Sequence, residues 1–245
     1  MKKNNIIIGK NSVLEALKAK RKIEMIMVSK MKKKQGTTEI LDLARSMGIS
    51  IVECDTKELD KKCDNSNHQG VIAIVPAYEY ASVDDILKKA KLRNEKPFII
   101  IADKIEDPHN LGAIIRTAEC AGAHGVIIPQ RRAAEITYTV NKTSAGAVEH
   151  VLVAKVRNIS QTIDDLKKIG IWVFGMEADG NLWTDVDFTG ASAIVVGSEG
   201  NGLSRLVREK CDMIVSLPLK GKVTSLNASV AGGIMMYEVV RQRNL

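Results

Sequence analysis

Aromatic residues are scarce in this chain: Phe, Trp and Tyr together make up 4% of its 245 residues. A platform on which the bases of single-stranded nucleic acid stack needs several aromatic side chains, so the composition argues against that mode of binding. Long apolar runs are also missing. The run at residues 6–8 is far too short for a signal peptide or a membrane span, and we expect no membrane partner.

Paired cysteines are absent as well. The four cysteines stand far apart in the sequence and form no C-x-x-C pair, which argues against a zinc site. Isolated thiols are typical of proteins that remain reduced in the cytosol. The sequence therefore favours a cytoplasmic protein without a metal site.

Positive charge is in excess, since 36 Lys and Arg against 29 Asp and Glu give a formal net charge of +7. An excess of this kind favours a polyanionic partner such as RNA. The basic run at residues 30–34 could contact phosphates, and an ordinary solvated face explains it equally well.

The length and the pattern of apolar residues predict two α/β domains. Residues 1–76 alternate short strands with helices, and residues 77–96 are highly charged and end in Asn-Glu-Lys-Pro before the next apolar run. We therefore expect a small N-terminal domain at residues 1–76, a linker at residues 77–96 and a second domain at residues 97–245.

The second domain repeats a strand followed by a helix. Its strands are predicted at residues 98–102, 126–128, 151–153, 171–174, 193–196 and 213–217. Its helices are predicted at residues 111–120, 140–147, 159–169 and 203–208. Near-continuous apolar strands that alternate with helices form a parallel sheet covered on both faces. Ligands of such sheets bind in the loops beyond the carboxyl ends of the strands.

The first such loop leads into a helix that carries Asn110 and, six residues on, Arg116. Asp107 or Asn110 could simply cap the helix. Arg116 lies in an otherwise apolar stretch, so it needs an anionic partner or an edge position. A phosphate is one candidate partner, and Glu119, three residues further along the helix, is the other.

The second loop is the glycine-rich run G-S-E-G-N-G, and the third is the polar stretch at residues 217–229 that opens the last helix. The second loop matches neither a dinucleotide-binding loop nor a P-loop nor a nucleophile elbow. In the third, Ser225 and Asn227 suit a helix start, and two nearby lysines make the stretch suitable for an anionic ligand. Gly232 and Gly233 indicate that another backbone packs against this helix.

The three loops together resemble motifs one, two and three of the SpoU/TrmH methyltransferases, which belong to the SPOUT superfamily. The matching patterns are N-x5-R after one strand, G-S-E-G-N-G after a later strand and P-L-x-G-x-V-x-S-L-N-A-S-V-A before the last helix. Each pattern is weak alone, but their joint order and spacing over residues 98–243 are specific. The N-terminal unit, which ends in H-Q-G-V, resembles the substrate-binding domain of the family, a domain similar to a ribosomal-protein fold.

The resemblance implies an α/β fold in which the last helix threads through a preceding loop and makes a trefoil knot. It implies a homodimer whose two subunits share the sites. It also implies that S-adenosylmethionine binds in a bent form to the backbone of Gly197, Leu217 and Leu226.

The polar site residues of the family match Asn110, Arg116, Glu199, Ser225 and Asn227. The implied reaction transfers a methyl group from the sulfonium of the cofactor to a ribose 2′-hydroxyl of RNA. Arg116 matches the catalytic residue of the family. Because arginine stays protonated near neutral pH, we expect Arg116 to stabilise developing oxyanion charge and a neighbouring phosphate rather than to act as a strict general base.

The two-part layout most resembles that of bacterial enzymes that methylate a guanosine of 23S rRNA, and this is the expected function. A tRNA ribose 2′-O-methyltransferase is the alternative within the same class. An RNA-binding protein of ribosomal type without catalysis is the alternative from another class. The complete set of polar site residues favours the enzyme, and binding of S-adenosylmethionine would separate the two classes.

Overall fold

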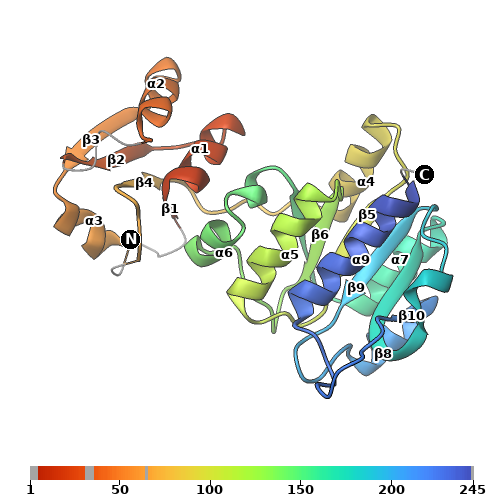
Figure 1. Ribbon diagram of the computed structural model, residues 1–245. Helices are drawn as coiled ribbons and strands as arrows, with labels where there is room; N and C mark the ends of the chain where they lie inside the picture. The colour runs from red at the N-terminus through yellow and green to blue at the C-terminus, as the bar shows by residue number, and fades with distance from the viewer. Residues whose placement is uncertain (1–4, 31–35, 64–65, 244–245) are drawn as a thin grey trace. The chain divides into compact units, whose positions relative to one another are not determined.

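The chain forms two compact units in a computed structural model that describes residues 5–30, 36–63 and 66–243 (Figure 1). The first unit consists of Met1–Glu79 and Glu135–His150, and the second consists of Tyr80–Ala134 and Val151–Leu245. Part of the basic run at residues 30–34 lies outside the described residues. No helix that is described has the length and apolar content needed to cross a membrane.

The first unit is built on a four-stranded mixed sheet in the order β1-β4-β2-β3. The strands are β1 (Ile6–Ile8), β2 (Met25–Ser29), β3 (Ser50–Cys54) and β4 (Val71–Ile74). The helices are α1 (Lys10–Lys18), α2 (Thr38–Ser46), α3 (Thr56–Lys62) and α6 (Tyr138–Thr143), with the 3₁₀ helix η2 (Ala147–Glu149). Successive strand residues point to opposite faces of a sheet. Ile7 accordingly joins the core under α1 and α2, whereas Ile6 and Ile8 join the core that includes Leu59 of α3.

Residues 135–150 belong to the first unit, which corrects the expectation that they form part of the second domain. A part-buried ion pair supplies the physical reason. Arg21 Nη1 donates to Glu149 Oε1 at 2.5 Å, and Asn141 Nδ2 donates to the same oxygen at 2.7 Å. Burial raises the pKa of the Glu149 carboxyl, and the Arg21 guanidinium opposes that shift. Local sequence patterns carry no sign of this pairing across 128 positions.

Most of the expected linker belongs to the second unit, which is a second correction. It contains α4 (Val83–Leu92), whose Ile86 and Ala90 are fully buried. Ile86 lies in the core cluster of that unit. A capping box starts the helix: Ser82 Oγ accepts from the Asp85 N–H at 3.1 Å, and Asp85 Oδ2 accepts from the Ser82 N–H at 3.0 Å. The sequence predicts a helix at residues 82–91, but its high charge favoured a linker over a packed part of the second domain.

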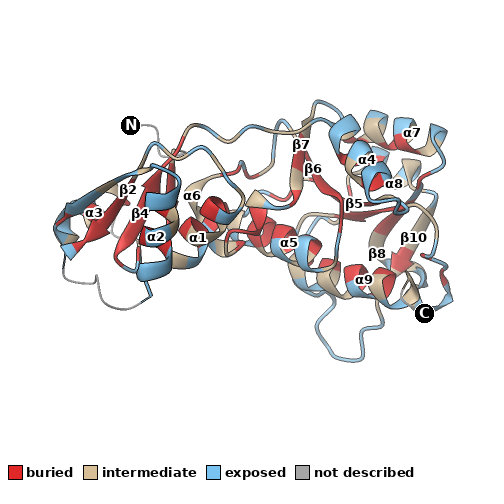
Figure 2. Cartoon of the chain, turned by 90° about the horizontal axis from the view of Figure 1, so that it is seen from above, coloured by how far each residue is buried: buried red, intermediate tan, exposed pale blue. Residues whose placement is uncertain are grey.

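The second unit is built on a six-stranded parallel sheet in the order β10-β8-β9-β5-β6-β7, which confirms the expected parallel α/β fold. The strands are β5 (Phe98–Ala102), β6 (Gly125–Pro129), β7 (Leu152–Val156), β8 (Trp172–Leu182), β9 (Ser192–Val196) and β10 (Met213–Ser216). The other elements are α5 (Pro108–Cys120), α7 (Ile159–Lys168), η3 (Trp183–Asp185), α8 (Arg205–Lys210) and α9 (Ala228–Arg243). Helices α4, α7 and α8 cover one face of the buried sheet, and α5 and α9 cover the other (Figure 2).

Helix α9 packs closely on β9 and on α5 through its two adjacent glycines. A Cβ atom on Gly232 would lie 3.1 Å from Val196 Cγ2 of β9, and one on Gly233 would lie 3.5 Å from Thr117 Cγ2 of α5. The glycines therefore permit a close approach, as the sequence indicated, but their nearest neighbours are side chains rather than another backbone.

Candidate active site

A hydrogen-bonded cluster joins three loops at the carboxyl edge of the parallel sheet. Asn110 on α5 donates through Nδ2 to Glu199 Oε1 at 2.9 Å. Asn227 donates through Nδ2 to Asn110 Oδ1 at 2.9 Å and also to Glu199 Oε1. We call these three residues the polar triangle. Each comes from a different one of the three loop-and-helix segments that the sequence singled out.

Asn227 is held in place by the helix that it starts. Its Oδ1 accepts from the backbone N–H groups of Ser229 at 3.0 Å and Val230 at 3.2 Å, which caps α9. The helix therefore begins at Ala228, and of the two residues that suit a helix start, Asn227 rather than Ser225 is the cap. Because Oδ1 serves the helix, Nδ2 faces the rest of the triangle.

Glu199 lies in a tight turn after β9. The turn is closed by two backbone hydrogen bonds between Ser198 and Gly202, at 3.0 and 2.9 Å. Gly200 and Gly202 have φ values of 80° and 58°, which favour glycine. In the part of the chain that the structure describes, Glu199 Oε2 has no hydrogen-bond partner. This oxygen is therefore available to a ligand.

Gly197 starts this turn, and its own loop requires a glycine there. A Cβ atom at position 197 would lie 2.4 Å from the Gly202 carbonyl carbon and 2.6 Å from the Leu203 nitrogen. The close neighbour of Gly197 is therefore the backbone at the end of the same turn, at Gly202 and Leu203.

A cavity of about 760 Å³ lies between the three segments 176–178, 196–202 and 215–231. Its lining includes six of the eight residues that the sequence singled out: Gly197, Glu199, Leu217, Ser225, Leu226 and Asn227. We call it the first cavity. Leucine side chains and the apolar ends of β9 and β10 lie beside exposed polar groups, which is typical of small-molecule sites.

Asn110 lines a second cavity of about 510 Å³. Ser198, Glu199 and Gly202 line both cavities, so the Glu199 turn is their common wall. The polar triangle therefore lies where the two cavities meet.

Arg116 does not join the polar triangle. It is exposed on α5 and lines neither cavity. Within residues 5–30, 36–63 and 66–243 it makes no hydrogen bond or ion pair, so the pairing with Glu119 that the sequence allowed is not formed. No described residue of its own chain pairs with this guanidinium.

Two acidic residues that sequence reasoning missed hold the Glu199 turn in place. Glu177 of β8 lines the first cavity, and its Oε1 accepts from the Leu203 N–H at 2.6 Å. Asp103, which is buried after β5, accepts from the Ser204 N–H at 2.7 Å. The only signal in the sequence was a carboxylate at or near the end of a predicted apolar strand: Asp103 directly follows residues 98–102, and Glu177 lies three residues beyond residues 171–174.

Comparison with known proteins connects this geometry to a family. Residues 97–237 match the model of the SpoU rRNA Methylase family, and residues 6–81 match the model described as RNA 2′-O ribose methyltransferase substrate binding. YacO of Bacillus subtilis (strain 168), assigned to the TrmH family of tRNA/rRNA methyltransferases, is 48% identical over 242 residues, which cover 98% of this chain and 97% of that protein.

Solved structures agree with the fold of both units. The SpoU methyltransferase AviRb from Streptomyces viridochromogenes, in complex with AdoMet, has a TM-score of 0.82 at 24% sequence identity. The match covers 99% of this chain and 91% of the AviRb chain. An AdoMet-bound rRNA methyltransferase from Sinorhizobium meliloti has a TM-score of 0.78 at 23% identity, with coverages of 98% and 87%. The resemblance inferred from the three motifs is confirmed, and this chain belongs to the SpoU rRNA methylase family.

Proposed function

We propose that this protein is an S-adenosylmethionine-dependent methyltransferase that modifies a ribose 2′-hydroxyl of RNA, with a guanosine of 23S rRNA as its target. The observation that carries the proposal is the first cavity. Three motifs that are far apart in the sequence line or border it, and the polar triangle connects them.

The residues of the first cavity fit the cofactor. Gly197, Leu217 and Leu226 offer backbone groups for an adenine edge, with leucine side chains as apolar cover. Glu177 and Glu199 bring negative charge to the same cavity, which suits a positively charged sulfonium. When bound, S-adenosylmethionine supplies the methyl group. AviRb and the S. meliloti enzyme, which share this fold, were solved with that cofactor.

The chain's own residues would position the acceptor oxygen and manage its proton. Alignment of the 2′-oxygen with the methyl group supplies much of the acceleration of such a displacement. Glu199 Oε2, which accepts from no donor among the described residues, would accept a hydrogen bond from the 2′-hydroxyl. Asn110 and Asn227 would fix the Glu199 carboxylate, and Ser225 would orient the nucleotide or the arginine clamp.

Arg116 would act in the cavity of a partner subunit. Its guanidinium is exposed outside both cavities of its own chain, and the adjacent helix α9 exposes Val230 and Tyr237 to 51% each. Exposed apolar side chains on a packed helix suit an interface with a second copy. In such a homodimer Arg116 would stabilise the developing oxyanion and a nearby phosphate. The trefoil knot formed by the last helix is part of the same proposal.

The first unit would bind the RNA substrate. Its match to the substrate-binding model of RNA 2′-O ribose methyltransferases supports this role, and so does the excess of positive charge. The S. meliloti enzyme, described as an rRNA methyltransferase, aligns over both units, which favours rRNA as the substrate. We place the reaction in the cytoplasm, where unpaired cysteines remain reduced. The name of the B. subtilis relative includes tRNA as well as rRNA, so a tRNA ribose methyltransferase is the second candidate.

The test is to map 2′-O-methyl marks in RNA from cells with and without this gene. We expect one mark in 23S rRNA to disappear, and purified protein to restore it only with S-adenosylmethionine. Loss of a tRNA mark instead would select the second candidate. Unchanged marks together with no binding of S-adenosylmethionine in calorimetry would leave a non-catalytic RNA-binding protein.

A further inference from the structure

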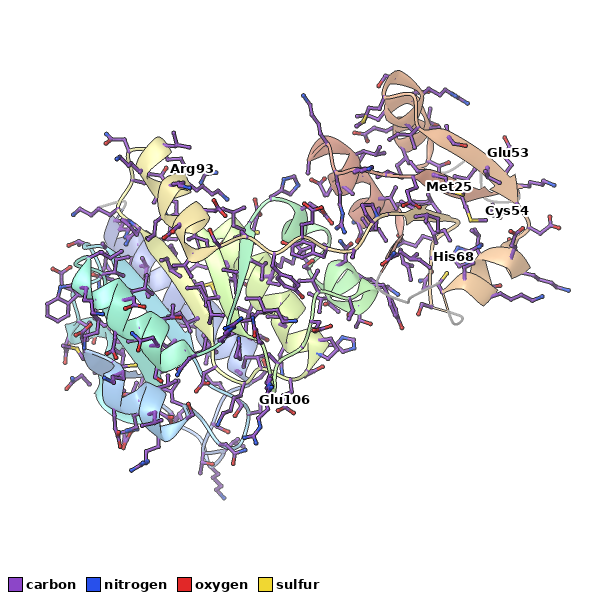
Figure 3. All side chains as sticks on the ribbon, turned by 180° about the vertical axis from the view of Figure 1, so that it is seen from behind. Met25, Glu53, Cys54, His68, Arg93 and Glu106 are labelled. Carbon is purple, nitrogen blue, oxygen red and sulfur yellow. The ribbon has the colours of Figure 1, made fainter. Side chains whose placement is uncertain are left out.

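The second cavity carries an inference about how the substrate is held. Its lining comes from the loop between β5 and α5, from the loop after β6 and from the Glu199 turn. Glu106, labelled in Figure 3, lies on the first of these loops. Because the cavity shares the Glu199 turn with the first cavity, a group bound here would lie directly beside the cofactor site.

Lys104 and Arg132 are the only cations among the described residues that line this cavity. Neither makes a hydrogen bond or an ion pair within the described part of the chain. Both side chains are therefore available to an anion from outside the protein.

Both cations also have unusual backbone conformations. Lys104 has a φ of 57° and Arg132 a φ of 56°, in the left-handed region that residues other than glycine seldom adopt. Such conformations persist only where the surroundings enforce them, and they cluster at functional sites. Glycine would suit both turns better, so the backbone alone does not explain a lysine and an arginine at these positions.

A backbone hydrogen bond fixes the two loops that carry Lys104 and Arg132 relative to each other. The Ala134 N–H donates to the Ile105 carbonyl at 2.8 Å, which joins the loop after β6 to the loop after β5. Ile105 and Ala134 are both buried. The buried Asp103, at the start of the loop after β5, accepts a hydrogen bond from the N–H of Ser204, which follows the Glu199 turn. The cavity is therefore built on a connected frame rather than on independent loops.

The acidic lining residues restrict where a phosphate can lie. Asp107 caps α5 by accepting from the His109 N–H at 3.0 Å, and Glu199 is held by the polar triangle. Glu106 is exposed. These carboxylates repel phosphate, whereas Lys104 and Arg132 attract it. The phosphates of a bound RNA would therefore lie beside the two cations. The neutral ribose would then face Glu199, at the wall shared with the first cavity.

We propose that the second cavity holds the acceptor nucleotide of the RNA, and that Lys104 and Arg132 bind the phosphates that flank it. This inference rests on the proposed methyltransferase function. Phosphate contacts fix the register of a nucleic acid without reading its sequence. The two cations are thus positioning residues that bring one 2′-hydroxyl to the cofactor.

The test uses Lys104→Gly and Arg132→Gly in the full-length protein, with Arg131→Gly as the matched control. Arg131 is the sequence neighbour of Arg132, but it does not line the cavity. We expect each test variant to raise the KM for RNA about 10-fold. The slope of the logarithm of the RNA-binding constant against the logarithm of the salt concentration should become shallower by about one unit, as loss of one phosphate contact predicts. Affinity for S-adenosylmethionine should stay unchanged.

The glycine variants separate this role from a structural one. Since glycine relaxes a left-handed backbone, Lys104→Gly should be at least as heat-stable as the parent while it binds RNA more weakly. Unchanged KM and salt slope in both variants, with an active parent protein, would overturn the inference and leave the proposed function intact. A parent protein that methylates no RNA would overturn the proposed function itself.

Discussion

Asn227 donates a hydrogen bond to Asn110 Oδ1 at 2.9 Å, although 117 positions separate the two residues in the chain. The same Asn227 side chain caps α9 through Oδ1. One amide group therefore fixes the start of the last helix and also sets the orientation of the polar triangle.

Asn227→Ser should separate these two tasks. Serine caps helices about as well as asparagine, so the free energy of unfolding should change by no more than about 0.5 kcal/mol. The donors to Asn110 and Glu199 would be lost, and misplacement of Glu199 should lower kcat about 100-fold. Thermal denaturation and turnover with RNA check both parts. Asn158→Ser, which makes the same change at the cap of α7 and touches no residue of the triangle, is the control. Normal turnover by Asn227→Ser would show that the triangle is dispensable.

Gly197→Ala should disrupt the Glu199 turn. The added Cβ would lie 2.4 Å from the Gly202 carbonyl carbon, and overpacking of this kind costs about 1–3 kcal/mol. Because the turn lines the first cavity, affinity for S-adenosylmethionine should fall together with the melting temperature. Gly190→Ala is the control, since a Cβ there meets nothing within 4 Å. Equal cofactor affinity in the two variants would mean that the turn tolerates displacement.

His124 should make the folded state sensitive to acid. Its Nδ1 accepts from the Phe98 N–H at 3.0 Å, and its Nε2 lies 2.9 Å from Glu95 Oε2. Burial lowers the pKa of His124, and Glu95 opposes the shift only in part. As the pH falls, the unfolded chain therefore takes up a proton on His124 more readily than the folded chain does. The contribution of neutral His124 to the free energy of unfolding is full above the unfolded pKa of about 6.5. This contribution is lost as the pH falls from there towards the lower folded pKa.

Denaturation midpoints measured between pH 8 and pH 5 check this expectation. The parent protein should lose stability through the lower part of that range. His124→Gln, which can still accept from the Phe98 N–H, should lose less over the same interval. Parallel pH profiles for the two proteins would assign the acid sensitivity to other groups.

The strands of the second unit could be predicted because each is a short apolar run that ends at a polar or glycine-rich loop. The run at residues 98–102 coincides with β5, and the run at 193–196 differs from β9 by one residue. Motif order was enough to identify the loops of the first cavity. The domain boundaries were wrong where they depend on packing between distant segments, as with the burial of α4 in the second unit and with the Arg21–Glu149 pair.

Site chemistry was harder to predict than site location. The sequence named Asn110, Glu199 and Asn227 as separate polar residues, but it could not show that Asn227 would serve both α9 and the triangle. Lys104 and Arg132 had no signal at all. Their left-handed φ values arise from the paths of two loops, and an ordinary lysine and arginine in the sequence do not reveal such a conformation.

Arg116→Ala should abolish methyl transfer and leave the affinity for S-adenosylmethionine nearly intact, because Arg116 lies outside the first cavity of its own chain. Glu199→Gln should be inactive for a different reason, since it alters the wall of the cavity itself. If Arg116 serves the partner's cavity, a mixed dimer of the two variants contains one site with both residues native. Equal co-expression should then restore about a quarter of the parent activity, because half of the dimers are mixed and each has one intact site.

A control mixture of the parent protein with an excess of Arg116→Ala gives the activity expected from one intact site per mixed dimer. No recovery in the mixture of Arg116→Ala with Glu199→Gln, despite mixed dimers in native mass spectrometry, would place Arg116 in the site of its own chain. That outcome would require α5 to move, because Arg116 lines neither cavity in the present conformation. Loss of cofactor binding by Arg116→Ala alone would make the residue structural.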